Sequence, residues 1–206
     1  HLNKEIKKYS KKENNNYYVS YGKLLNSKLD FDNNLKKILF SNDVYNLSLD
    51  KFKKNCKLKW QKFSENQNNN YIFECCFLQN PITTMLAYHN SSKYQIEKYI
   101  KEIEKIILEL NPIIIYLNKK NINKSFDLIK KQRSNEWYNF VLNYVTNQKY
   151  GKQNNLEGYE GLLKFYKNSN KFQLKLLSEL SIKNLVINDP HKDWNKTYKI
   201  ILDNID

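Results

Sequence analysis

A chain of 206 residues with 40% hydrophobic side chains can bury one sizeable core, which favours a single domain over residues 1–206. Its 34 Lys and one Arg outnumber the 21 acidic residues, which gives a formal charge of +14. The chain also has 32 Asn, and an AT-rich genome produces such a composition without any polyanionic partner. One Arg is also few for a dedicated nucleic-acid binder, so the charge alone does not indicate that function.

The sequence also argues against a membrane protein and against a protein stabilised by disulfides or zinc. No run of about 18 apolar residues is present, so neither a membrane span nor a membrane partner is expected. Cys56, Cys75 and Cys76 are an odd number without CxxC spacing, which argues against a disulfide framework and a zinc site and favours reduced thiols in the cytoplasm. The polar start lacks both an initiator Met and the pattern of a signal peptide, so the natural product is expected to extend before His1.

The first part of the chain is predicted to be mostly helical, apart from a short β-like piece, Tyr17-Tyr-Val-Ser-Tyr21, which ends at Gly22. Apolar residues recur every three or four positions over 33–40 and 48–63, which indicates helices. The run Tyr71-Ile-Phe-Glu-Cys-Cys-Phe77 then predicts a short strand over 71–76. That strand carries one carboxylate, Glu74, close to its carboxyl end.

The rest of the chain alternates helices with short apolar strands. The runs at 112–117 and 183–188 are typical of parallel strands that are buried on both faces. Together with 71–76 they predict an α/β fold, in which three layers form from one parallel sheet with helices on both faces. Helices are expected over 81–89, 91–110, 121–133, 135–150, 159–180 and 194–204.

Glu74 is the first candidate for chemistry. An unpaired charge inside an apolar strand is costly to bury, and ligands of parallel α/β sheets bind beyond the carboxyl ends of the strands. At that position Glu74 could hold a magnesium ion or accept the proton of an acceptor hydroxyl. The alternative that stays open is a structural carboxylate paired with a Lys or a helix N-terminus.

The one arginine, Arg133, ends the expected helix over 121–133, just after Lys130 and Lys131. Only a guanidinium grips phosphate through two parallel hydrogen bonds, and kinases use mobile cationic lids to neutralise the transferred phosphoryl group. We therefore expect Arg133 to be catalytic and the two lysines to bind phosphate. The open alternative is a solvated basic face on which Arg133 stabilises the helix dipole.

Four further residues complete the predicted site. Gln79 and Asn80 follow the end of the predicted strand and could present their amides to a base or sugar of the acceptor. Lys152 could add a phosphate contact. Trp137 follows the basic cluster and could stack on a base, although aromatic residues at helical spacing are more often part of a core.

No phosphate-cradling motif Gly-x-x-x-x-Gly-Lys-Ser/Thr occurs in the chain, and His89 and His191 have no partner at ligand spacing. Other strings are more specific: Tyr21-Gly-Lys-Leu, Asn42-Asp-Val-Tyr, Tyr71-Ile-Phe-Glu-Cys-Cys-Phe-Leu-Gln-Asn-Pro-Ile, Leu110-Asn-Pro-Ile-Ile-Ile-Tyr-Leu, Gln132-Arg-Ser-Asn-Glu-Trp, Tyr150-Gly-Lys-Gln-Asn-Asn-Leu-Glu-Gly and Leu185-Val-Ile-Asn. Through them, the chain from about Tyr17 onward resembles thymidylate-kinase-like P-loop proteins of low-GC bacteria and, more loosely, the nucleoside and nucleotide kinases.

The resemblance implies a kinase-like sheet whose central P-loop strand would lie before His1. It also implies ATP and Mg²⁺ as cofactors, with Glu74 as the strand-end acid and metal ligand and Arg133 as the lid arginine. Thymidylate kinases place an Asp-Arg pair after the acidic strand, whereas Cys75 follows Glu74 here. This departure argues against thymidylate as the substrate.

Two functions stay open at this point. The leading one is ATP-dependent phosphoryl transfer to a small acceptor such as a nucleoside or nucleotide, and a homodimer is compatible with it. The alternative is a non-catalytic kinase-derived domain that binds nucleic acid or a protein through its basic surface. In the leading interpretation the domain has an acceptor-side helical region over 17–70 and a core of strands and a helix over 71–118. A lid-like region follows over 119–158, and a helix, a strand and a helix close the domain over 159–206.

Overall fold

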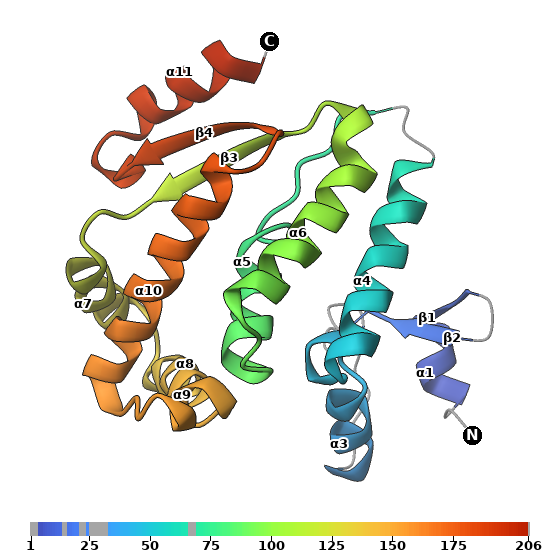
Figure 1. Ribbon diagram of the computed structural model, residues 1–206. Helices are drawn as coiled ribbons and strands as arrows, with labels where there is room; N and C mark the ends of the chain where they lie inside the picture. The colour runs from blue at the N-terminus through green and yellow to red at the C-terminus, as the bar shows by residue number, and fades with distance from the viewer. Residues whose placement is uncertain (1–3, 14–15, 21–23, 25–32, 66–68, 206) are drawn as a thin grey trace. The chain divides into compact units, whose positions relative to one another are not determined.

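Two compact units, His1–Leu47 and Ser48–Asp206, make up the computed structural model. Figure 1 shows its helices and strands, coloured along the chain. The residues that the structure describes are 4–13, 16–20, 24, 33–65 and 69–205.

The first unit contains a short antiparallel hairpin, in which the predicted β-like piece over 17–21 is confirmed as one strand and the other strand was not predicted. Strands β1 (Ser10–Glu13) and β2 (Asn16–Val19) pair with Ser10 opposite Val19 and Glu13 opposite Asn16. The predicted helix over 33–40 is confirmed as α3 (Asn33–Ser41). Residues 21–23 of the Tyr21-Gly-Lys-Leu string lie outside the described part of the chain. The described residues of this unit also form the helices α1 (Lys4–Lys8) and η1 (Val44–Asn46).

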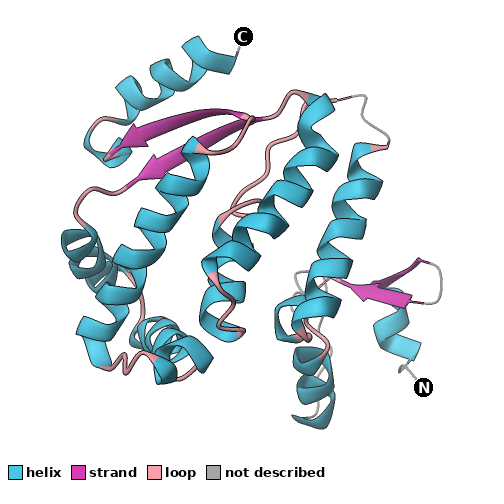
Figure 2. Ribbon diagram, viewed as in Figure 1, coloured by secondary structure: helices cyan, strands magenta, loops and turns pink. Residues whose placement is uncertain are grey.

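The second unit is mostly helical, as the cyan ribbons in Figure 2 show. A local signal marks the start of α6 (Lys93–Ile107), where Ser92 and Gln95 form a reciprocal capping box. Every predicted helix of this unit is confirmed in its existence. The bounds are α4 (Leu49–Ser64), α5 (Gln79–Thr83), the π-helix η2 (Thr84–Tyr88), α6 (Lys93–Ile107), η3 (Leu108–Leu110), α7 (Ile122–Gln132), α8 (Asn135–Thr146), α9 (Lys149–Gln153), α10 (Gly158–Ser178), η4 (Pro190–Lys192) and α11 (Trp194–Ile205).

A parallel pair of strands forms the sheet of the second unit. Strand β3 (Ile113–Asn118) pairs with β4 (Lys183–Asn188) over their whole length, from Ile113 opposite Lys183 to Asn118 opposite Asn188. This confirms the predicted parallel pairing of two of the three expected strands. Figure 1 shows α11 on one side of the pair and α10 on the other.

The predicted three-layer sheet with helices on both faces is wrong. Among the described residues the strands form only two small sheets of two strands each. The segment expected as a strand over 71–76 is an irregular loop that ends in a turn. Its aromatic side chains pack on α4 instead of on a sheet, with Phe73 centred 5.2 Å from Trp60 and 4.8 Å from Phe63. The left-handed backbone of Cys75, with φ of 62°, also interrupts any extended strand.

The core of the second unit lies among its helices. Fully buried apolar side chains come from α4, α5, η2, α6 and α10, and α4 packs on α6 while α10 packs on α7 and α8. None of the helices in the described residues is both long and apolar enough to cross a membrane. The buried set includes Phe52, Ile82, Met85, Ile96, Ile100, Ile103, Leu162, Leu163, Phe165 and Leu176.

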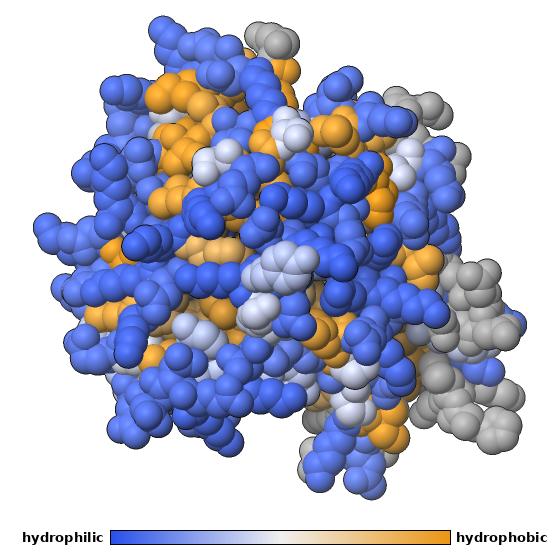
Figure 3. All heavy atoms as spheres, in the orientation of Figure 1, coloured by the Kyte–Doolittle hydropathy of each residue, from blue (hydrophilic) through white to orange (hydrophobic). Residues whose placement is uncertain are grey.

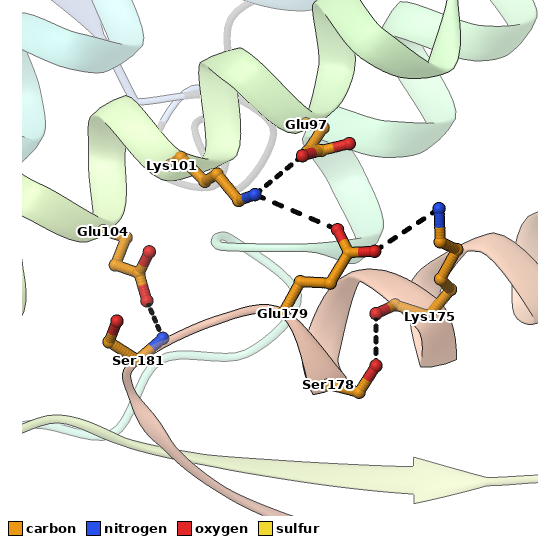
Figure 4. A network of polar contacts seen from close by, with 7 residues as sticks. All are labelled: Glu97, Lys101, Glu104, Lys175, Ser178, Glu179 and Ser181. Carbon is orange, nitrogen blue, oxygen red and sulfur yellow. Dashed lines mark hydrogen bonds and ion pairs between the residues drawn. The ribbon is translucent and has the colours of Figure 1, made fainter.

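A buried carboxylate fixes the amino end of β4. Glu104 of α6 is 7% exposed and accepts hydrogen bonds from the backbone N–H groups of Ser181, at 2.6 Å, and Ile182, at 3.1 Å. Figure 4 shows this contact beside a chain of ion pairs between α6 and α10. In that chain the Lys101 ammonium lies 2.7 Å from Glu97 and 3.9 Å from Glu179. The Glu104 carboxylate therefore holds the segment before β4 to α6, and the ion pairs join α6 to the end of α10.

Candidate functional site

Glu74 does not lie at the end of a strand. It is an exposed residue in the loop before α5, and its own carbonyl accepts a hydrogen bond from the Cys76 thiol at 3.1 Å. Partial burial raises the pKa of the neighbouring Cys75 thiol, and the Glu74 carboxylate raises it further. The physical reason for expecting a catalytic acid here was burial in a strand, and that reason is removed by the structure.

The predicted acceptor-binding amides lie close to Glu74. Gln79 and Asn80 form the first turn of α5, where the Gln79 side chain accepts from the Cys75 thiol at 3.4 Å. The Asn80 backbone N–H donates to the Cys75 carbonyl at 3.0 Å. These contacts close a turn, which gives both residues a local structural role.

The predicted lid residues form a second, separate group at the junction of α7 and α8. Arg133 is exposed, and its guanidinium carbon lies 5.6 Å from the centre of the Trp137 ring. Lys130 lies 5.3 Å from the ring of Tyr138. Among the described residues no hydrogen bond or ion pair joins this group to Glu74. The exposed Lys131 and the exposed Lys152 of α9 complete the predicted phosphate set.

A magnesium site at Glu74 does not fit the residues present. No group of three or more His, Cys, Asp or Glu side chains in the described part of the chain could hold a metal ion. Mg²⁺ binds oxygen ligands with near-octahedral geometry, and one exposed carboxylate supplies too few of them. We therefore derive no chemical step through a metal at this position.

The strongest polar constellation instead lies where β3 and β4 end together. Because the strands are parallel and in register, their carboxyl ends share one edge, the position at which ligands of α/β sheets bind. The Asn118 side chain donates to Asn188 at 2.6 Å, and the Asp189 backbone N–H donates to the Asn118 carbonyl at 2.7 Å. We call residues 118–124 and 188–196, which continue from the two strands, the strand-end edge.

A relay of polar side chains supports this edge from α10. Tyr116 donates its hydroxyl to Asn170 at 2.8 Å, and Asn170 donates its amide to Asn118 at 3.2 Å. Burial raises the pKa of Tyr116 to about 12, so its hydroxyl stays a donor at neutral pH. Asn118 is only 6% exposed, so the relay satisfies a buried amide and fixes its orientation.

The edge gathers cationic side chains from both loops. Lys119, after β3, contacts Nδ1 of His191, after β4. Partial burial lowers the pKa of Lys119, while the charge of Asp189 opposes that shift. The Lys120 side chain is exposed and forms no ion pair with a described residue.

The two acidic residues of the edge are already engaged. The Asp189 carboxylate accepts from Lys192 at 3.0 Å and from the backbone N–H of Lys120 at 3.0 Å, and these hydrogen bonds hold its pKa below the ordinary value. Asp193 caps α11 by accepting from the backbone N–H of Lys196 at 2.9 Å. The acids therefore organise the loops and leave a surplus of positive charge.

Two helices begin at the edge. Asn121 caps α7 by accepting from the Lys124 N–H at 2.9 Å, and α11 begins directly after its cap at Asp193. Helix starts carry partial positive charge and favour anions. With its cations, this arrangement can hold a dianionic or polyanionic group such as phosphate.

Arg133 lies at the far end of α7 from this edge. The 11-residue helix is about 16 Å long at 1.5 Å per residue, so Arg133 does not belong to the edge. Single residues and local spacings do not reveal the edge, because it forms only where two strands that are distant in the sequence end together. Both strands end in Asn followed by charged residues, and the strand-end rule applied to this shared pattern could have found Lys119, His191 and Lys192.

A separate hollow of about 170 Å³ lies in the first unit and contains none of the predicted site residues.

No family model matches this chain, and neither does any curated protein or solved structure. The geometry of the strand-end edge is therefore the basis for a functional proposal.

Proposed function

We propose that the strand-end edge binds a phosphate-bearing small molecule of the nucleotide class. The observation that carries the proposal is the shared carboxyl end of β3 and β4, from which both loops bring lysines and both following helices begin. Over residues 118–124 and 188–196 the sequence has five Lys and two Asp, a formal sum of +5 − 2 = +3.

Placement supports this proposal more than the total charge does. An AT-rich genome scatters lysines over the surface of a protein. It does not explain why both acidic residues of the edge already have partners, Asp193 as a helix cap and Asp189 in an ion pair with Lys192, so that the other lysines of the edge are not neutralised. The Asn118–Asn188 hydrogen bond also joins the two points at which the loops leave the strands, which limits the movement of the loops before any ligand binds. Such preorganisation lowers the entropic cost of binding.

The test measures the binding of ATP, ADP and inorganic tripolyphosphate to the full chain by thermal shift and by calorimetry. We expect the double variant Lys119→Ala, Lys120→Ala to lose about tenfold or more in affinity, since a charge-assisted hydrogen bond contributes roughly 1.5 to 3 kcal/mol. Saturating ligand at 100 times Kd should stabilise the wild type by about 2.7 kcal/mol.

A matched control uses two exposed lysines of α10, in the double variant Lys164→Ala, Lys167→Ala. This variant removes the same charge and should keep the wild-type affinity. Equal losses in both double variants would show that only the net charge matters. Absence of any shift with all three ligands would overturn the proposal.

Phosphoryl transfer to a nucleoside or nucleotide acceptor, with ATP and Mg²⁺, stays a prediction from the sequence resemblance. If the protein turns over ATP, Glu74→Gln should lower kcat about 100-fold when Glu74 is the catalytic base. Arg133→Lys should stay clearly impaired when the guanidinium grips the phosphoryl group through two hydrogen bonds. Unchanged turnover in both variants would assign these residues structural roles.

A further inference from the structure

We infer that the outer face of α11 is a stacking surface for single-stranded nucleic acid. The surface consists of Trp194, Tyr198, Lys196 and Lys199. Trp194 and Lys196 also lie within the strand-end edge, at which a small phosphate-bearing ligand is proposed to bind, whereas Tyr198 and Lys199 lie beyond it. The inference does not depend on that proposal, because it concerns ring planes and lysines along a helix.

Two large aromatic side chains are exposed side by side on this helix. Trp194 is 45% exposed and Tyr198 is 56% exposed, and they lie four residues apart, on one face of α11. Their ring centres are 5.7 Å apart and their planes differ by 26°, so the rings are stacked on one another. A stacked pair of exposed rings offers an outer π-face to a base, and every base has a matching π-face.

The rest of α11 holds the helix in place and keeps this face outward. Thr197, 3% exposed, donates its hydroxyl to the Pro190 carbonyl at 3.0 Å, which ties the helix to the loop after β4. At the other end the Lys183 ammonium donates to the Asn204 carbonyl at 2.6 Å. In Figure 3 apolar side chains gather over the region that α11 occupies in Figure 1.

Charge identifies nucleic acid as the occupant. Lys196 and Lys199 are exposed and form no ion pair with a described residue, so both ammonium groups can meet phosphates. These two exposed lysines near the rings, rather than the formal charge of +14 of the whole chain, favour a polyanion as the occupant. Lys199 follows Tyr198 directly and lies beside the ring pair, while Lys196, two residues after Trp194, projects from another side of the helix. Aromatic rings flanked by lysines are the combination that sequence-tolerant single-strand binders use.

Leu202, which is 58% exposed, extends the same face by a further turn and provides a way to separate nucleic acid from a protein partner. An apolar segment of a partner protein would depend on Leu202 as much as on the aromatic rings. A single strand of nucleic acid would depend on the rings and the lysines and only weakly on Leu202.

The experiment measures fluorescence anisotropy of a labelled ten-nucleotide oligothymidylate with the full chain at several salt concentrations. Loss of one stacked base costs about 5- to 150-fold in affinity, so Trp194→Ala and Tyr198→Ala should each weaken binding by about fivefold or more. The double variant Lys196→Ala, Lys199→Ala should lower the slope of log K against log salt by about 1.4, since each phosphate contact on a single strand contributes about 0.7.

Controls keep the result interpretable. Trp194→Phe retains a π-face and should keep most of the affinity, and circular dichroism of each variant verifies that the fold is intact. Leu202→Ala should bind within about twofold of the wild type, and a duplex of the same length should bind more weakly because its bases are already stacked. Undiminished oligothymidylate binding by Trp194→Ala would overturn the inference, as would a loss in Leu202→Ala equal to that in Trp194→Ala.

Discussion

The two ends of the β3–β4 pair are built on opposite electrostatic principles. At the amino end, the buried Glu104 carboxylate accepts hydrogen bonds from two backbone N–H groups. The nearby Lys101 ammonium forms ion pairs with two glutamates. At the carboxyl end, Asp189 and Asp193 are both consumed locally, while lysines from two loops remain in excess. At one end each of these charged groups has a partner within the fold, and the other end carries surplus positive charge.

The difference shows how structural and binding charges can be told apart in a lysine-rich chain. A structural charge has its partners within the fold and is buried, as Glu104 is at 7% exposure. A charge available to a ligand keeps its ammonium group accessible; Lys120 is exposed, and its backbone N–H is fixed by the Asp189 carboxylate at 3.0 Å. The number of lysines alone carries neither kind of information.

The largest expected effect concerns the amino end. Glu104→Ala should lower the free energy of unfolding by about 2 to 4 kcal/mol, because it leaves the N–H groups of Ser181 and Ile182 without their charged acceptor. Urea unfolding followed by circular dichroism measures the change. Glu104→Gln keeps one acceptor oxygen and should lose less than Glu104→Ala. Glu109→Ala, at an exposed position, should stay within about 0.5 kcal/mol of the wild type, and an equally mild Glu104→Ala would break the comparison.

An intermediate effect is expected in the relay below the carboxyl end. Tyr116→Phe removes the hydroxyl that donates to Asn170, which should cost about 0.5 to 1.5 kcal/mol of stability at pH 7. The folded-state pKa of Tyr116 is about 12, above the unfolded value of about 10, so its ionisation favours unfolding as the pH rises between these values. The stability difference between wild type and variant should therefore shrink above pH 10. A difference that is independent of pH would mean that the hydroxyl is not buried.

The smallest effect should come from Asp189 itself. Its hydrogen bonds to Lys192 and to the Lys120 N–H lower its pKa, so its contribution is present above the unfolded pKa of about 3.9 and is lost as the pH falls through the lower folded value. Asp189→Asn tolerates the local φ of 49° and should slightly lower Tm at pH 7. The two melting temperatures should converge toward pH 3. A gap that widens in acid would show that Asp189 is not stabilised as a carboxylate.

Periodicity predicted most of the local structure of the second unit. Strand β4 spans the predicted residues 183–188 without a shift, and β3 is shifted from 112–117 by one residue. These runs are short and apolar, and they are separated by long amphipathic helices, so local and tertiary preferences agree. Periodicity did not indicate how many strands would pair, because pairing depends on distant partners.

The segment Tyr71–Phe77 shows why the pattern failed. Aromatic residues favour strands only when a neighbouring strand offers a surface for them. Here Trp60 and Phe63 of α4 offer that surface instead, and Tyr71 packs edge-on to Phe63 with ring centres 5.2 Å apart. Catalytic candidates chosen on the assumption of a strand, Glu74 above all, inherited this error. The residues of the strand-end edge became visible only through the parallel register of β3 and β4.

Arg133 gives the molecule a spectroscopic label that needs no engineering. Since the chain contains one arginine, its Nε–H group yields a single side-chain signal of this type in a ¹⁵N-correlated NMR spectrum, which is assigned without mutagenesis. The guanidinium lies over the Trp137 ring, so the ring current makes the chemical shift sensitive to their distance of 5.6 Å. Any rearrangement of the corner between α7 and α8 can thus be followed in real time through one resonance.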